Sequence, residues 1–162
     1  MFVEFEKMPP DARIWIYQAN KPLNESSKGL LSEKIISFLN EWQSHGNGLK
    51  TSWKLFFDRF LILAVDEKYN SISGCSIDKS VHYLRTLGND LEIDFLEKSS
   101  IAVFEQNNIS TFTLKEVKNL IKEGKITRES IIFNNLVSTL SDLDSNWQQP
   151  ASQTWLSRSF NP

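Results

Sequence analysis

The sequence predicts a single folded domain of the α+β class with an antiparallel sheet, and three observations support this prediction. Runs rich in β-branched and aromatic residues alternate with stretches whose apolar residues recur at helical spacing. The apolar fraction of 40% and the charged fraction of 23% are typical of a folded globular chain. No repeat, low-complexity tract or linker divides the 162 residues, so we expect residues 1–162 to form a single domain.

The first predicted elements are a strand and a helix. Residues 13–18 include four consecutive strand-forming residues and lie between prolines, and both faces of this strand are apolar. Residues 24–43 form a helix with one apolar stripe, and Gly46 and Gly48 end it. The stripe consists of Leu31, Ile35, Phe38, Leu39 and Trp42.

A hairpin comes next. Residues 51–57 alternate apolar and polar side chains, Asp58 and Arg59 make a tight connection, and residues 60–66 are almost wholly apolar. The first of these strands is therefore expected to be half exposed and the second to be buried.

A second helix is predicted after the loop that follows the hairpin. Apolar residues recur at helical spacing in residues 77–84, and Ser76 is the predicted N-cap. Gly88 and Asn89 are predicted to close this helix.

The remaining elements form a C-terminal extension over residues 107–162. Residues 101–105 and 109–112 make a second hairpin, and Thr113 with Glu116 has the capping-box spacing of a third helix that Gly124 stops. A short strand at residues 130–133 follows. The polar tail beyond it carries Trp147, Trp155 and Phe160, which indicates a docked segment.

The order of elements through residue 106 is strand, helix, strand, strand, helix, strand, which is the ferredoxin-like βαββαβ pattern. Its first and third strands lie centrally, in agreement with the two strands that are apolar on both faces. Because both helices of that fold cover one face, we expect the extension to cover the other. The apolar residues expected on that second face are Trp15, Tyr17, Leu61 and Leu63.

Composition limits the location and the partners. The net charge of -2 with intermixed signs gives no basic face, which argues against a nucleic acid or an anionic membrane as partner. The longest apolar run, residues 60–65, is far short of the roughly 20 residues that span a bilayer, and residues 1–10 do not resemble a signal peptide. A single cysteine agrees with a reducing compartment. The sequence thus predicts a cytoplasmic protein without membrane insertion.

The candidate site is the strand-to-helix junction within residues 61–78, because it holds the only cysteine. Cys75 lies at the start of the second helix, where free amides and the helix dipole favour a thiolate. The alternative is a small filler residue in a turn shaped by Gly74. His45 and His82 are the only imidazoles, and for each the alternative to a functional role is an ordinary surface histidine.

Acidic residues flank the same junction. Asp66, Glu67 and Asp78 could hold a hard cation, but their spacing fits no known cation loop, and a solvated acidic turn with a helix cap is the alternative. Neither GxxxxGK[ST] nor GxGxxG occurs, so no phosphate cradle, no metal and no cofactor are predicted. The candidate ligand-binding residues are Asp66, Gly74, Cys75, Ser76, Asp78 and His45.

Several segments resemble a small bacterial family whose members often carry the description "ABC transporter ATPase". The most similar are the AVDE strand end, the GCSID turn and the FNNLV stretch, and the resemblance covers nearly the whole chain. Because the chain has no Walker A lysine and no LSGGQ-like segment, we do not expect ATPase activity. A local resemblance to GYF-like adaptor modules runs over residues 113–150 and implies an aromatic pocket for proline-rich peptides.

Three functions follow. The first is a non-enzymatic domain that binds a small ligand or a protein partner at the junction of Asp66 with residues 74–78, and a homodimer is left open. The second is an enzyme or redox protein that uses Cys75. The third, implied by the family description, is a protein associated with an ABC transporter.

Overall fold

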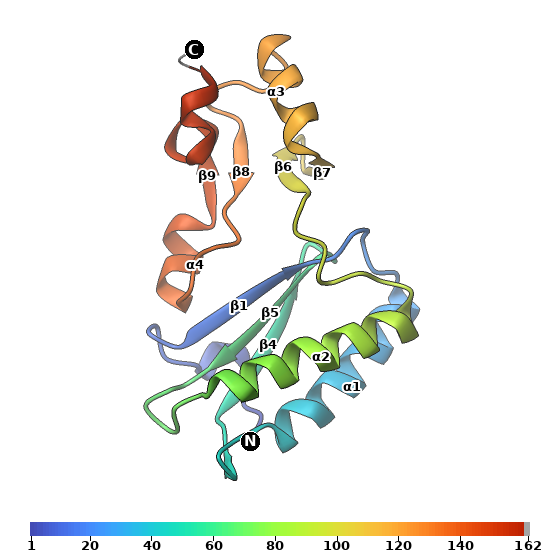
Figure 1. The fold of residues 1–162 in the computed structure, drawn as a ribbon, viewed down its shortest axis with the longest axis vertical. Helices are drawn as coiled ribbons and strands as arrows, with labels where there is room; N and C mark the ends of the chain where they lie inside the picture. The colour runs from blue at the N-terminus through green and yellow to red at the C-terminus, as the bar shows by residue number, and fades with distance from the viewer. Residues whose placement is uncertain (161–162) are drawn as a thin grey trace. The chain divides into compact units, whose positions relative to one another are not determined.

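The computed structural model describes residues 1–160 and has an α+β fold with antiparallel sheets (Figure 1). The chain divides into two compact units. The first consists of Met1–Glu97 with Ser138–Ser141, and the second consists of Lys98–Val137 with the chain from Asp142 onward. The prediction that both belong to one domain stays a prediction.

The first unit is built on a three-stranded sheet in the order β1-β5-β4. Its strands are β1 (Arg13–Gln18), β4 (Thr51–Phe56) and β5 (Phe60–Val65), and all neighbours are antiparallel. The predicted strand and hairpin are confirmed, and β5 is the buried central strand because both of its faces are apolar. In the connection between β4 and β5, Phe57 and Asp58 both have a φ of 55°.

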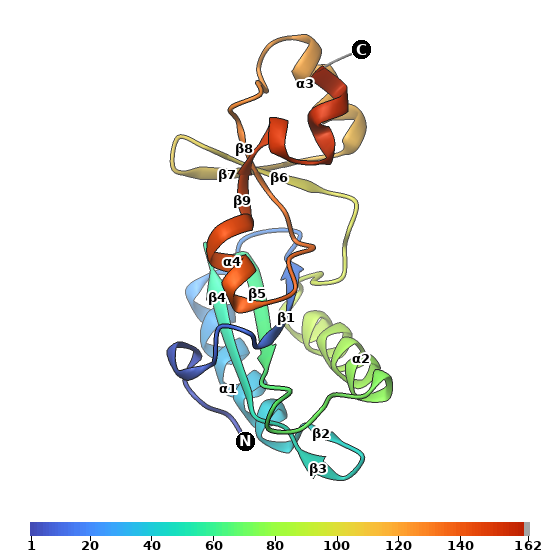
Figure 2. The ribbon, with the colours of Figure 1, turned by 90° about the vertical axis from the view of Figure 1, so that its left-hand side faces the viewer.

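Helices α1 (Glu25–Glu41) and α2 (Gly74–Leu91) lie side by side on one face of this sheet (Figures 1 and 2). The Tyr83 hydroxyl on α2 donates to the Lys34 carbonyl on α1 at 2.7 Å, and the Tyr83 ring stacks on Phe38 at 4.2 Å. A short hairpin of β2 (Gln43–Ser44) and β3 (Asn47–Gly48) follows α1.

The core under the helices corrects one expectation. Tyr17, Leu61 and Leu63 belong to the buried cluster on the helix side, and Trp15 packs against that cluster, so these four residues do not lie on the opposite face. The sequence could not assign the face, because in a strand that is apolar on both sides a shift of one residue gives an equally good pattern. The alternate residues of β5, whose side chains point to the opposite face, are also fully buried: Phe60, Ile62 and Ala64.

The N-terminal segment packs against the edge strand β4 of the first unit. It contains the short 3₁₀ helix η1 (Phe5–Lys7). The Ser52 hydroxyl donates to the Val3 carbonyl at 2.7 Å, and the ring of Phe5 meets that of Phe56 edge-on at 6.1 Å. These contacts tie the start of the chain to the edge strand.

A fourth strand from residues 101–105 is absent from the described sheet of the first unit, contrary to the predicted pairing. That segment is β6 (Ile101–Glu105), and it belongs to the sheet of the second unit. Instead, a stretch at Thr139 forms a β-bridge with Arg13 of β1, and a stretch at Asp94 bonds to Asn20, two residues beyond the end of β1. The Asn20 amide donates to the Asp94 carbonyl at 3.0 Å, and the Ile14 amide donates to the Ser138 carbonyl at 2.9 Å. The partner of a strand can lie far away in the sequence. The pattern of residues within β6 therefore does not identify the strand with which it pairs.

The second unit contains an antiparallel sheet in the order β7-β6-β8-β9. Its strands besides β6 are β7 (Asn108–Phe112), β8 (Ile131–Phe133) and β9 (Gln148–Pro150). Helices in this part of the chain are α3 (Leu114–Lys122), α4 (Leu140–Asn146), η2 (Ala151–Gln153) and η3 (Trp155–Phe160).

The capping box predicted for the third helix is confirmed. The Thr113 hydroxyl accepts from the Glu116 amide at 3.2 Å, and the Glu116 carboxylate accepts from the Thr113 amide at 2.7 Å. Of the aromatic residues in the tail, Trp147 is buried and Trp155 is 54% exposed. Over residues 1–160, no helix is both long and apolar enough to span a bilayer.

Candidate functional site

The N-terminal end of α2 holds most of the predicted site residues, and Ser73 is its cap. The Ser73 side chain accepts a hydrogen bond from the Ser76 amide at 3.2 Å, and Ser73 has the extended backbone of an N-cap. The prediction that Ser76 is the cap is therefore wrong. Both serines precede the apolar stripe, and the path of the loop decides which one lies outside the first turn.

Ser76 joins α2 to the end of α1. It is buried, and its hydroxyl donates to the Gln43 carbonyl at 2.7 Å. Its own carbonyl accepts from the Trp42 indole nitrogen at 2.9 Å. The hydroxyl and the carbonyl of Ser76 are thus both hydrogen-bonded to other parts of the fold.

The carboxylate of Asp66 is also paired with other groups of the fold. It is 8% exposed, and its Oδ2 lies 3.1 Å from the Lys50 ammonium. Its Oδ1 accepts from the Lys68 amide at 3.1 Å, which holds the turn that follows β5. The hydrogen bond that the Lys68 ammonium donates to the Asp11 carboxylate, with a smaller attraction to Asp66, raises the pKa of that ammonium.

The remaining candidates lie on the surface. Gly74, Cys75 and Asp78 are exposed on the first turns of α2, and His45 is exposed in the turn between β2 and β3 with a φ of 51°. Among the described residues, no hydrogen bond or ion pair joins Cys75, Asp78 and His45 to one another. His82 is exposed further along α2. The structure does not assemble these residues into one polar cluster, and their role in binding stays a prediction.

Glu67, the remaining acidic residue of the predicted junction, is also paired. Glu67 pairs with Arg13 at 3.6 Å. Within residues 1–160, no group of three or more His, Cys, Asp or Glu side chains is placed to hold a metal ion.

The C-terminal end of α2 turns sharply around Gly88. The helix runs on to Leu91, past the glycine expected to end it, and Glu92 then has a left-handed φ of 56°. The Ile93 amide donates to the Gly88 carbonyl at 2.9 Å. A Cβ atom on Gly88 would lie 2.4 Å from the Ile93 carbonyl oxygen. Only glycine therefore allows the chain to pass this close to the helix.

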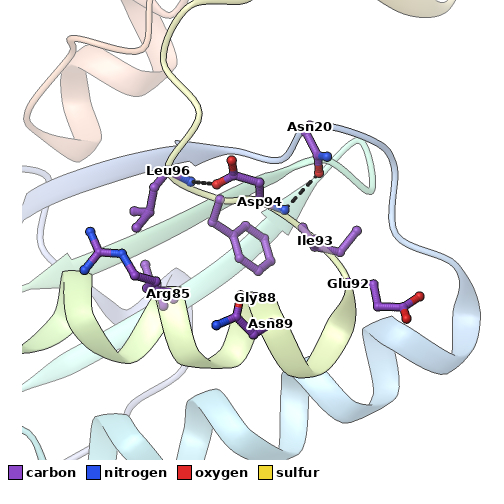
Figure 3. Close-up of a pocket in the computed structure, with 10 residues that line it drawn as sticks. Asn20, Arg85, Gly88, Asn89, Glu92, Ile93, Asp94 and Leu96 are labelled. Carbon is purple, nitrogen blue, oxygen red and sulfur yellow. Dashed lines mark hydrogen bonds between the residues drawn. The ribbon is translucent and has the colours of Figure 1, made fainter.

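The returning segment is fixed to the end of β1. The Asp94 amide donates to the Asn20 side-chain oxygen at 2.9 Å, and the Asn20 amide donates back to the Asp94 carbonyl at 3.0 Å. The Asp94 carboxylate accepts from the Leu96 amide at 2.9 Å (Figure 3). These bonds hold residues 94–96 beside α2.

A hollow of about 570 Å³ lies between α2 and this segment (Figure 3). Its apolar lining includes Leu84, Ile93 and Phe95, which are buried, whereas Arg85 and Glu92 on its rim are exposed. In the described chain, neither Arg85 nor Glu92 makes an ion pair within 4 Å. The hollow thus combines buried apolar residues with three charged side chains, Arg85, Glu92 and Asp94, that make no ion pair in the described chain.

None of these lining residues is among the candidates that the sequence predicts. The signals in the sequence are Gly88, which by itself predicts only a helix stop, and the seven-residue spacing of Arg85 and Glu92 along one helical face. Neither signal identifies a hollow, because the returning segment that forms its other wall has no recognisable pattern.

Comparison of the chain with family models, curated proteins and solved structures found no match. The resemblances to the bacterial family and to the GYF-like modules therefore stay predictions.

Proposed function

We propose that the protein is a non-enzymatic binding domain and that the hollow at the C-terminal end of α2 receives a segment of a partner protein. The observation that carries this proposal is the pair of uncompensated rim charges, Arg85 and Glu92, beside buried apolar residues. Charged groups at the N-terminal end of α2 include Asp66, which the fold already neutralises.

The dimensions and rigidity of the hollow support this function. Ligand sites typically have volumes of about 300–1,000 Å³ and contain a few polar groups that give orientation. The paired hydrogen bonds between Asn20 and Asp94 hold the wall formed by residues 93–96, and the tight turn at Gly88 keeps this wall close to α2. A preorganised wall lowers the entropy cost of binding.

The test is a selection of random displayed octapeptides on the full chain, followed by affinity measurements with a variant that fills the hollow. Asn89 lines the hollow and is exposed, so Asn89→Trp should fill it without changing the core. Asn119→Trp is the matched control on α3, outside the hollow.

We expect the selected peptides to bind the wild type and Asn119→Trp equally and to bind Asn89→Trp at least tenfold more weakly. Peptides that bind Asn89→Trp as well as the wild type would contradict the proposed site. A selection that enriches no peptide would contradict the proposed function.

A second candidate function uses Cys75 as a redox thiol or nucleophile. The exposed position of Cys75 on the first turn of α2 favours it, because a reagent or substrate can reach the free thiol there. This function predicts that peroxide oxidises Cys75 in the folded protein faster than it oxidises free cysteine. An oxidation rate equal to that of free cysteine would exclude it.

The family description implies a third function, in which the protein acts with an ABC transporter and a nucleotide. Nucleotide at about 100 times its dissociation constant would add ~2.7 kcal/mol to the free energy of unfolding. We expect millimolar Mg-ATP to leave the melting temperature unchanged, because the sequence lacks a phosphate loop. A rise of several degrees would support nucleotide binding.

For the fold, we propose that the first unit is a ferredoxin-like core whose fourth strand is interrupted. The order β1-β5-β4 agrees with that topology. The stretch at Ser138 bonds to Ile14 of β1, and the stretch at Asp94 bonds to Asn20 just beyond this strand. We retain the proposal that residues 107–162 cover the second sheet face. A chain ending at Gly124 should then lose cooperative melting, and a soluble, cooperatively melting product would contradict this.

A further inference from the structure

We infer that the hollow selects an extended peptide segment that carries one acidic and one basic side chain three or four residues apart, with an apolar side chain between them. This inference rests on the proposed function. It follows from the spacing of the two rim charges, the width of the hollow and the apolar part of its lining.

The spacing is set by α2. Arg85 and Glu92 are seven residues apart, which is about 10 Å along a helix. Figure 3 shows them at opposite ends of the hollow. An extended chain covers about 10 Å in three residues of polyproline II and about 13 Å in four residues of a β-strand, and in both cases the two side chains lie on one face.

The width favours an extended occupant over a helical one. Spread along about 10 Å, a volume of 570 Å³ corresponds to a mean cross-section of about 57 Å². An extended chain requires about 48 Å², since strands are spaced about 4.8 Å apart within a sheet and sheets about 10 Å apart. A helix with its side chains is about 10–12 Å across and would not fit.

The two ends have opposite charge. Arg85 provides a guanidinium at one end, and Glu92 provides a carboxylate at the other, where the negative end of the α2 dipole adds to it. A partner segment therefore places its acidic side chain near Arg85 and its basic side chain near Glu92. Leu96, the partly exposed apolar residue of the lining, accepts an apolar side chain between them.

The experiment uses four blocked pentapeptides titrated into the full chain by NMR. Their end residues are aspartate and lysine in either order, two aspartates, or two lysines, with leucine, alanine and leucine between. Because charge pairs at such sites contribute up to about 1 kcal/mol each, we expect the mixed-charge peptides to bind at least about fivefold more tightly than both like-charge peptides.

Charge-reversal variants give the decisive readout. Arg85→Glu should prefer the dilysine peptide, and Glu92→Lys should prefer the diaspartate peptide. Lys79→Glu on α2 and Glu33→Lys on α1 are matched controls outside the hollow, and they should keep the preference of the wild type.

The outcomes separate the two proposals. Equal binding of all four peptides, with shifts confined to the hollow, would overturn the charge-spacing inference and leave the proposed function standing. A preference that the two reversals do not change would also overturn the inference. If no peptide shifts the resonances of the hollow at millimolar concentration, the inference is wrong, and the octapeptide selection decides the proposed function.

Discussion

The buried polar groups at the N-terminal end of α2 and the rim charges at its C-terminal end differ in how the fold engages them. At the N-terminal end, Ser73 caps the helix, Ser76 bonds to Gln43, and Asp66 pairs with Lys50. At the C-terminal end, the rim charges Arg85 and Glu92 have no ion-pair partner in the described chain.

This difference separates residues that stabilise the fold from residues available to a ligand. A polar group that the fold already satisfies must lose its partner before it can bind a ligand, and that loss costs about 1–3 kcal/mol when the group is buried. A charged group at the rim of an open hollow has no such cost. The comparison therefore favours the C-terminal end, although the sequence drew attention to the N-terminal end.

The largest expected effect is at the C-terminal end. Gly88→Ala should lower the free energy of unfolding by about 3 kcal/mol, because the new Cβ would lie 2.4 Å from the Ile93 carbonyl oxygen and the returning segment must move. Gly29→Ala is the matched control on α1, where no atom lies within 4 Å of the new Cβ. It should stabilise the protein by about 0.5–1 kcal/mol. Urea denaturation of both variants measures the difference, and a Gly88→Ala protein as stable as the wild type would show that the turn is not constrained.

The next effect tests how far the N-terminal end depends on Asp66. Asp66→Ala should cost about 2 kcal/mol, because it leaves the partly buried Lys50 ammonium and the Lys68 amide without their acceptor. Asp66→Asn keeps an acceptor for the Lys68 amide and should cost about half as much. Thermal denaturation at pH 7 compares the two, and unchanged stability in both would leave Asp66 free to act as a ligand-binding group.

A smaller effect distinguishes the two serines at the start of α2. Ser73→Ala should cost about 1 kcal/mol through loss of the N-cap. The control is Ser71→Ala, which changes an exposed serine in the preceding loop and should alter stability by less than about 0.5 kcal/mol. Equal stability of the two variants in urea would be inconsistent with capping by Ser73.

The smallest effect concerns Cys75. Cys75→Ser should change the free energy of unfolding by less than about 0.5 kcal/mol, because the side chain is exposed and makes no hydrogen bond within the described chain. The thiol of the wild type should react completely with a disulfide reagent under native conditions. Labelling only after unfolding would show that Cys75 is buried in solution and would remove the redox candidate.

The local elements were predictable because their signals are local. The strand at residues 13–18, the hairpin of residues 51–66 and the Thr113–Glu116 capping box follow from side-chain periodicity and capping chemistry within a few residues. The site was less predictable. The residues chosen from sequence were those with reactive side chains, and the sequence does not reveal which of them the fold has already paired.

By itself, the sequence determined the α+β class, the order of helices and strands through β8 apart from the short β2–β3 hairpin, and the position of the junction that contains Cys75. Only the tertiary structure decided that Tyr17 and Leu61 face the helices, that β6 pairs outside the first sheet, and that the turn at Gly88 forms one side of a hollow. Periodicity acts within one element. Face assignment, strand pairing and the satisfaction of polar groups instead depend on residues far apart in the chain.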